Sequence, residues 1–401
     1  MAQTAANLLE HVLPRVPLRQ FVLTFPFELR TRLAYDGALL GTASRIVVDS
    51  ILGFYRRRIG GGGTRSPSKG GAVTVVQRLS ADLRLNPHLH IVALDGVFVA
   101  GPGGTPVFQP LPELATRDVA DLVQVVRARV VRLLIHQGVV EDDDTLTVLT
   151  DDIAEREPAL ARLAAAAVSG LAPAGPERRN GLHPVTLRGR RHIQSTAPLC
   201  ATDLGFSLHA ATTAAAEDER GREALVRYIL RPPVAQERLE LLPDDLVRIH
   251  LRRPFADGTV AVDLDPLSLL CRLCAAVPPP RFNTVRYAGV LAAASSWRAL
   301  VVPPPPEPTP HHDPGSTTAA KPPTHRSVWR PWHELLKRTF DVDLQACSRC
   351  GGHMKLKAIL TGSESTQRLL RSMGEPTDPP RRAPARDPPT YKSRVLRRQR
   401  R

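Results

Sequence analysis

The run LRLNPHLHIVALDGVFV is apolar and rich in β-branched residues, and it carries two histidines two positions apart. In a β-strand alternate side chains point to one face, so His88 and His90 would share a face while Leu89 enters the core. The sequence therefore predicts a strand over residues 88–99, paired in a hairpin with a strand over 72–78. Two imidazoles on one face can bind one metal ion. The alternative is a solvated or hydrogen-bonded pair of histidines without a metal.

Tyr228, in ALVRYILRPPVAQERL, is a candidate nucleophile. Apolar spacing predicts a short helix that the following Pro-Pro pair must end. One face of this helix carries four side chains: Ala224, Leu225, Tyr228 and Ile229. Arg227 and Arg231 lie four residues apart beside the tyrosine and are candidate phosphate contacts. A phenol that attacks phosphorus while a cation holds the phosphate can cut DNA, whereas the alternative is a tyrosine of the apolar core.

A two-histidine site needs a third ligand from another segment. Gln77, near the end of the preceding strand, could face the histidines across the hairpin, and Gln236 and His209 are rival candidates. Imidazoles alone favour zinc, but a site completed by an amide oxygen, water and phosphate suits Mg²⁺ or Mn²⁺.

The charge of the chain points to a polyanionic partner. It has 54 basic against 39 acidic residues, a formal net charge of +15, and only six of the basic residues are lysines. Arginine suits the bidentate binding of phosphates, so nucleic acid is the simplest partner. The basic segment LRGRRHI contributes Arg190 and Arg191 as further candidate phosphate contacts, with an ordinary exposed strand edge as the alternative.

The remaining periodic segments predict a mixed fold. Residues 20–26 favour a strand, and residues 39–55 and 116–138 favour helices, the latter with Thr116 as N-cap and Gly138 just past its end. The glycine-rich stretch 60–71 predicts a flexible loop, and the acidic run that starts at Glu141 predicts a solvated loop without chemistry.

The C-terminal part of the chain has a different composition. The stretch 301–327 is proline-rich with almost no apolar residues, which predicts an extended linker. Residues 328–375 predict a small module in which Cys347 and Cys350 are spaced as one knuckle of a zinc ribbon. Five histidines are candidates to complete such a Zn²⁺ site: His311, His312, His325, His333 and His353. The basic, proline-rich tail 376–401 predicts disorder.

The five cysteines are too few and odd in number for a disulfide framework, which indicates a reducing compartment. Cys271 and Cys274 form a second CxxC pair, but LSLLCRLCAAV predicts a buried helix in which cysteine acts as a small hydrophobe. The N-terminus lacks a signal peptide, and no apolar run approaches the roughly 18 residues of a membrane span. These features predict a cytoplasmic protein without a membrane partner.

Several motifs occur together and in order: the HLH pair, the tyrosine before RPP, QERLELLPDDLVRIHLRRPFADGT, PPPRFNTVRYAGVLA and CSRCGGHMKL. With these motifs the chain resembles the IS91-like transposases, which are HUH endonucleases, over residues 11–302 and 329–376. Two features differ from that family. Its N-terminal cysteine-rich zinc domain has no counterpart here, and Ala224 occupies the position where some relatives carry a second tyrosine.

The resemblance implies an α+β fold, with a central antiparallel sheet flanked by helices in the manner of the HUH palm, within a catalytic region spanning residues 1–300. It also implies that His88 and His90 bind a divalent cation and that Tyr228 forms a 5′-phosphotyrosine on single-stranded DNA. The expected function is then rolling-circle-like transposition of an insertion element in the bacterial nucleoid. The alternatives are a plasmid replication initiator or relaxase with the same chemistry, and an inactive DNA-binding remnant.

Overall fold

The structure is a computed structural model. It describes residues 2–59, 68–141, 147–148, 156–173, 183–184, 194–232, 234–278, 281–303, 332–340, 342–347, 350–354, 360, 362–377 and 394–399. These residues fall into two compact units. One comprises the described residues from 3 to 303 together with 394–399, and the other comprises those from 332 to 377.

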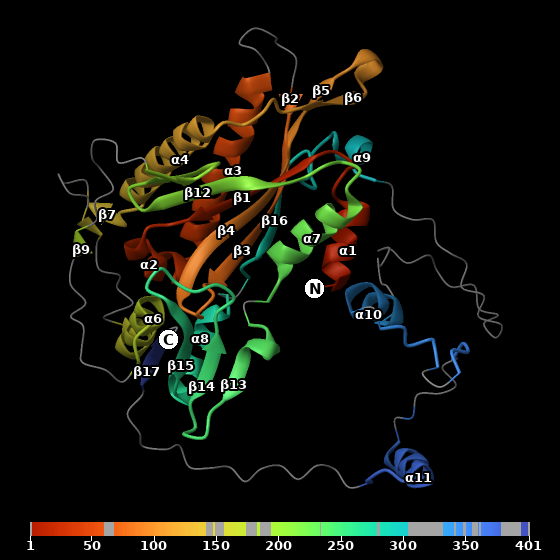
Figure 1. Cartoon of the computed structure of the whole chain (residues 1–401). Helices are drawn as coiled ribbons and strands as arrows, with labels where there is room; N and C mark the ends of the chain where they lie inside the picture. The colour runs from red at the N-terminus through yellow and green to blue at the C-terminus, as the bar shows by residue number, and fades with distance from the viewer. Residues whose placement is uncertain are drawn as a thin grey trace. The chain divides into compact units, whose positions relative to one another are not determined.

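An antiparallel sheet of seven strands is the frame of the first unit (Figure 1). From one edge to the other its strands are β10 (Gln194–Ala197), β11 (Cys200–Asp203), β12 (Phe206–Ala214), β1 (Leu18–Thr24), β4 (Leu85–Leu94), β3 (Gly71–Leu79) and β16 (Val285–Gly289). Helices cover both faces, so the prediction of an α+β fold with a central antiparallel sheet between helices is confirmed. The predicted hairpin is β3 and β4, which pair directly.

The alternation of side chains along the strands gives the sheet two different faces. Leu89 and Ile91 of β4 point to a core formed with α3 (Gly37–Ile59) and α4 (Thr116–His136). Val92 and Leu94 point the opposite way, to a second core formed with α1 (Ala2–His11) and α7 (Glu219–Leu230). Because His88 and His90 alternate with Leu89, they lie on the side of α1 and α7. Figure 1 shows α3 and α4 on one side of the sheet and α7 with α1 on the other.

Helix α3 is longer and more apolar than expected from the sequence, in which no apolar run approaches the length of a membrane span. By length and composition alone it is long and apolar enough to cross a membrane. However, most of its apolar stretch is buried inside the protein, where Val47, Ile51 and Tyr55 pack in the core beside the sheet. The hydropathy of α3 is therefore accounted for by its place in the core.

The predicted strand over 88–99 is wrong in one respect, because it is two strands. β4 ends at Leu94, and β5 (Gly96–Ala100) pairs with β6 (Pro106–Pro110) and β2 (Ser68–Lys69) in a separate sheet. Between them the Asp95 carboxylate accepts hydrogen bonds from Arg19 and from the Tyr55 hydroxyl. A Cβ at Gly96 would lie 2.2 Å from a carbonyl oxygen of β6, so only glycine permits this close approach.

The predicted N-cap of α4 is also wrong. The helix spans Thr116–His136, and its cap is Ala115, whose amide donates to the Asp118 carboxylate. The hydroxyl of Thr116 instead accepts from the amide of Leu199, 3.1 Å away, because the β10–β11 turn packs against the helix start. At the other end Gly138 follows the helix with φ +62°, as its position predicts.

A second, smaller sheet belongs to the same unit. It consists of β13 (Leu239–Leu241), β14 (Val247–His250), β15 (Thr259–Leu264) and β17 (Val395–Gln399). It packs with α6 (Pro158–Ser169) and α8 (Pro266–Ala276) around a third core. The predicted disorder of the tail therefore does not hold for β17, which pairs with β15 and brings Arg398 to the buried Asp263 carboxylate at 2.8 Å.

Helix α8 is the predicted helix around the second CxxC pair, but its cysteines are not core residues. Cys271 is partly exposed and Cys274 is exposed, because the buried face of α8 is formed by Ser268, Arg272 and Ala275. The remaining elements of this unit are α2 (Arg30–Tyr35), α9 (Arg298–Val301), β7 (Val140–Glu141), β8 (Thr147–Val148), β9 (His183–Pro184), and the 3₁₀ helices η1 (Phe27–Leu29), η2 (Pro102–Gly104) and η3 (Gln236–Arg238).

The second unit contains α10 (Trp332–Phe340), α11 (Ser363–Met373) and a tight turn between them. In this turn the Cys347 amide donates to the Gly352 carbonyl at 2.9 Å, and the Gly351 amide donates to the Cys347 carbonyl at 2.8 Å. Gly351 has φ +67°, the left-handed conformation that glycine adopts readily. The predicted glycine-rich loop at 60–67 and the proline-rich stretch 304–331 lie outside the described residues, as do residues 142–146 of the acidic run.

Candidate active site

His88 and His90 lie side by side on β4, in the central part of the sheet. Their ring centroids are 5.0 Å apart with the ring planes inclined at 61°. Nδ1 of His88 lies 2.7 Å from the backbone carbonyl of Asn86 and donates to it, which leaves the lone pair on Nε2. A histidine ligand in a metal site commonly has its second nitrogen engaged in this way, because the bond fixes the ring.

His90 is held by a residue that the sequence analysis did not single out. Nε2 of Gln20, on the neighbouring strand β1, lies 2.8 Å from Nδ1 of His90, and both side chains are 3% exposed. The opposite orientation of the amide makes an equivalent bond, in which Nδ1–H donates to the amide oxygen and the Nε2 lone pair becomes available. A polar residue in the apolar strand sequence LRQFVLT was the only signal for Gln20.

The surroundings favour the neutral form of both imidazoles. Burial lowers the pKa of His88, and the nearby charge of Arg30 lowers it further, against the opposing effect of the Asn86 carbonyl. Burial, with the charges of His88 and Arg231, lowers the pKa of His90 to about 3. Since a metal ligand must carry a free lone pair, two histidines that remain neutral at pH 7 suit a cation site.

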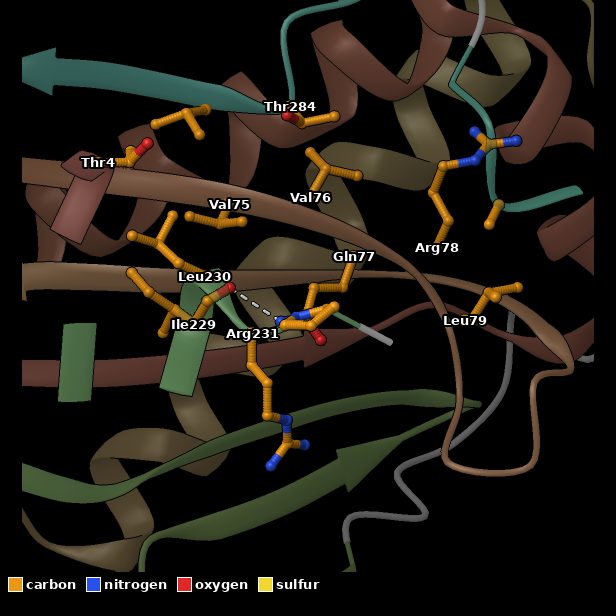
Figure 2. A pocket seen from close by; sticks show the side chains of 13 residues that line it. Thr4, Val75, Val76, Gln77, Arg78, Leu79, Ile229, Leu230, Arg231 and Thr284 are labelled. Atoms are coloured by element: carbon orange, nitrogen blue, oxygen red, sulfur yellow. Dashed lines mark hydrogen bonds between the residues drawn. The ribbon is translucent and has the colours of Figure 1, made fainter. Parts of the chain in front are cut away.

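Gln77 lies directly across the hairpin from His88, as its place in the sequence predicts, because the two residues are Cα partners in the β3–β4 register. Its amide nitrogen donates to the carbonyl of Ile229, 2.9 Å away, which ties β3 to the last turn of α7 (Figure 2). The amide oxygen of Gln77 remains to contact a cation or the substrate.

Helix α7 carries Tyr228 to the histidines. The helix starts at an Asp218 cap, where the carboxylate accepts from the Gly221 amide at 2.8 Å, and it ends before Pro232. Arg222 is buried and donates to the carbonyls of Val16 and Pro14, at 2.6 and 2.8 Å, which anchors the helix to the segment after α1. The ring of Tyr228 then lies 5.5 Å from that of His90, centroid to centroid.

Tyr228 is not a core residue. Its side chain is 46% exposed, and the buried side chains of the helix are Arg222, Leu225, Val226 and Ile229. The predicted helical face therefore runs from the buried Leu225 and Ile229 to an exposed margin with Ala224 and Tyr228, and the alternative of a core tyrosine is wrong. The Tyr228 side chain is accessible to a substrate while its ring contacts that of His90.

The two flanking arginines differ. The Arg231 guanidinium lies 5.1 Å from the centre of the Tyr228 ring, a cation–π distance. Arg227 forms an ion pair with Glu223 of the same helix at 3.0 Å. Arg231 is therefore placed to meet a phosphate at the tyrosine, whereas Arg227 points along the helix surface. Arg190 and Arg191 lie outside the described residues.

Of the two rival third ligands, His209 does not join the pair. His209 on β12 and His90 on β4 both pair with Val22 of β1, so they are two strand spacings apart, about 10 Å. Gln236 lies in η3, and its side chain is not among the described ones. In the described part of the chain no group of three or more His, Cys, Asp or Glu residues could hold a metal ion.

The candidate zinc ligands of the second unit are only partly described. Cys347 is partly exposed and Cys350 is exposed, and Ala346 forms a bridge with His353 across the turn. His333 lies on α10, whereas His311, His312 and His325 are outside the described residues.

A cavity of about 390 Å³ adjoins Gln77 on the side away from the histidines. Figure 2 shows its walls, formed by β3, the end of α7, the start of α1 and the segment that enters β16. Its lining combines apolar side chains with five polar ones: Thr4, Gln77, Arg78, Arg231 and Thr284. Arg231, whose guanidinium also lies 5.1 Å from the centre of the Tyr228 ring, is the residue that the cavity and the tyrosine share.

Comparison with known families places this arrangement in context. Residues 71–298, more than half of the chain, match the family described as "Putative transposase". The chain belongs to this transposase family. The matched span of the transposase includes β3, β4 and α7, and therefore Gln77, both histidines and Tyr228. No curated protein and no solved structure matched the chain.

Family membership makes the transposase a DNA-processing enzyme and gives DNA as its substrate class. This agrees with the partner predicted from the charge of +15. Gln20 lies outside the matched span, so the residue that holds His90 comes from a part of the transposase that the family match does not include.

Proposed function

We propose that this transposase is an HUH endonuclease of the IS91-like type, which cleaves single-stranded DNA and transfers the strand with Tyr228 as its one nucleophile. The observation that supports the proposal is the meeting of three side chains: the His88 and His90 rings lie 5.0 Å apart, and the Tyr228 ring lies 5.5 Å from His90. An exposed tyrosine beside two neutral imidazoles, that of His90 buried and that of His88 partly buried, suits attack on a phosphodiester held by a cation.

The residues fit a divalent cation. His88 and His90 would each bind it through Nε2, because Nδ1 of each ring is engaged elsewhere, and the amide oxygen of Gln77 is the proposed third donor. Two nitrogens with amide, water and phosphate oxygens suit Mg²⁺ or Mn²⁺. The bound ion would supply stabilisation of the charge that develops on the scissile phosphate.

The remaining steps belong to the chain itself. The Tyr228 oxygen attacks phosphorus and loses its proton to solvent, and the bond from phosphorus to the 3′-oxygen breaks. The leaving 3′-oxygen takes up a proton from solvent. The products are a 5′-phosphotyrosine and a free 3′-hydroxyl, so the energy of the phosphodiester is kept for rejoining. Arg231 faces the Tyr228 ring and is placed to bind a phosphate oxygen during this step.

The experiment is incubation of the protein with labelled single strands from the DNA that flanks the gene, with Mn²⁺ or EDTA, followed by denaturing electrophoresis. We expect a DNA-shifted band that needs Tyr228 and Mn²⁺ and is absent in Tyr228→Phe, although that variant binds the strand with similar affinity. A band that persists in Tyr228→Phe would refute the assignment of the nucleophile. Binding without any band would favour the inactive remnant, and cleavage confined to a plasmid origin would favour the replication initiator.

We also propose that Cys347 and Cys350 are two ligands of a structural Zn²⁺. The supporting observation is the tight turn that carries them, in which the Gly351 amide donates to the Cys347 carbonyl and the Cys347 amide donates to the Gly352 carbonyl. Zinc content of the purified protein should fall in Cys347→Ser. Equal zinc content in the two proteins would exclude this site.

A further inference from the structure

We propose that the cavity beside Gln77 binds a nucleobase of the DNA strand, from the nucleotide next to the phosphate that Tyr228 attacks. This inference rests on the proposed function and adds to it a site that reads the strand. The cavity lies beside Gln77, its walls are largely apolar, and the Arg231 guanidinium lies at its edge.

The cavity has the size and lining of a small-molecule site. Its volume is about 390 Å³, within the range of roughly 300–1,000 Å³ of ligand pockets. Val75, Leu230 and Val285 give it apolar walls, and Thr4 and Thr284 add hydroxyl groups. A planar base needs apolar surfaces for its faces and a few hydrogen-bonding groups for its edge.

Two arginines line the cavity, and their guanidinium groups differ in their partners. That of Arg78 donates to the carbonyls of Ala34 and Ala275, which leaves Arg231 as the arginine placed for a phosphate. Arg231 lines the cavity, and its guanidinium lies 5.1 Å from the Tyr228 ring, so it stands between the nucleophile and the apolar walls. A phosphate at Arg231 would be within reach of the tyrosine, and the attached base would then face the apolar side. This arrangement fits a ligand in which an anionic group is joined to a flat, weakly polar ring.

The distance from the histidines to the cavity is short enough for one nucleotide to span it. Gln77 pairs with His88 across neighbouring strands, about 4.8 Å apart, and Val285 pairs with Val75 on the next strand. The cavity therefore begins one strand away from the proposed cation ligands. The base that enters it belongs to a nucleotide directly attached to the scissile phosphate.

The test uses the full chain with Tyr228→Phe, so that no adduct forms, in EDTA. The probe is the fluorescent single strand that the wild type cleaves, with the nucleotide on either side of the cleaved phosphate replaced in turn by an abasic residue. Affinity is measured by anisotropy. Two variants fill the cavity independently, Thr4→Trp on α1 and Val285→Trp on β16, and circular dichroism checks that they fold. Gln3→Trp, on the exposed side of α1, is the matched control.

We expect one of the two abasic strands to bind about tenfold more weakly, the loss typical of one stacked base. In the cavity-filling variants this difference between intact and abasic strands should disappear, whereas Gln3→Trp should keep it. The proposal would be overturned if both abasic strands bound as tightly as the intact strand. It would also be overturned if the weaker binding of an abasic strand persisted in both cavity-filling variants.

The adduct assay with the wild type separates this inference from the function on which it depends. If the wild type forms the adduct but the abasic strands bind as tightly as the intact strand, only the proposal of a base site in the cavity is refuted. If no single strand forms an adduct, the proposed function fails and the base site fails with it.

Discussion

Replacing Gln20 by methionine tests whether the site depends on a buried hydrogen bond between neighbouring strands. Methionine has a similar length but cannot bond to Nδ1 of His90, 2.8 Å from the Gln20 amide. Both side chains are 3% exposed, so water cannot replace the lost partner. An unsatisfied buried polar group costs about 1–3 kcal/mol, and we expect the metal-free variant to lose that much free energy of unfolding.

The same substitution should also weaken cation binding. Without Gln20 the His90 ring is free to turn, and loss of a group that orients a metal ligand typically reduces affinity about 10- to 100-fold. Unfolding by urea in EDTA measures the first effect, and electron paramagnetic resonance of free Mn²⁺ measures the second. Gln20→Glu, which can still accept from Nδ1–H, should restore most of the Mn²⁺ affinity. An unfolding free energy within 0.5 kcal/mol of wild type (about the scatter of neutral substitutions), together with unchanged Mn²⁺ affinity, would refute this account of the site.

Three further perturbations follow from other buried groups. The pKa of His90 is about 3 in the folded chain, whereas that of a free histidine is about 6.5. As the pH falls below 6.5 the unfolded chain therefore gains a proton at His90 and the folded chain does not, so the folded state loses stability. Urea unfolding in EDTA should show that the free energy of unfolding falls by about 2 kcal/mol from pH 7 to 5, and by less in His90→Gln. Arg398→Met removes one of two arginine partners of the fully buried Asp263 and should cost about 1–2 kcal/mol, with hydrogen exchange faster along β15 than along β1; equal exchange would contradict the docking of β17. Tyr55→Phe removes a 2.8 Å hydrogen bond to the Asp95 carboxylate and should lower the free energy of unfolding by about 1 kcal/mol without changing DNA cleavage, which the adduct assay would check.

The local sequence pattern was sufficient to predict most of the helices and strands near the site. The alternation in β4 predicts that His88 and His90 share a face, and the proline pair after Leu230 predicts the end of α7. These features depend on neighbours within a few residues, for which backbone geometry alone sets the direction of each side chain. The register of a tight hairpin likewise follows from local pairing, which is why Gln77 could be placed opposite His88.

The sequence by itself thus determined the strand pair, the tyrosine helix and the residue types of a candidate site that acts on DNA. Only the tertiary structure decided that Tyr228 meets His90, since Arg222 anchors α7 to carbonyls more than 200 positions away along the chain. It also decided that Gln20 holds His90 and that the tail strand β17 completes the second sheet. Such contacts depend on which distant segments pack together, and that packing reflects burial summed over a whole core rather than any local motif.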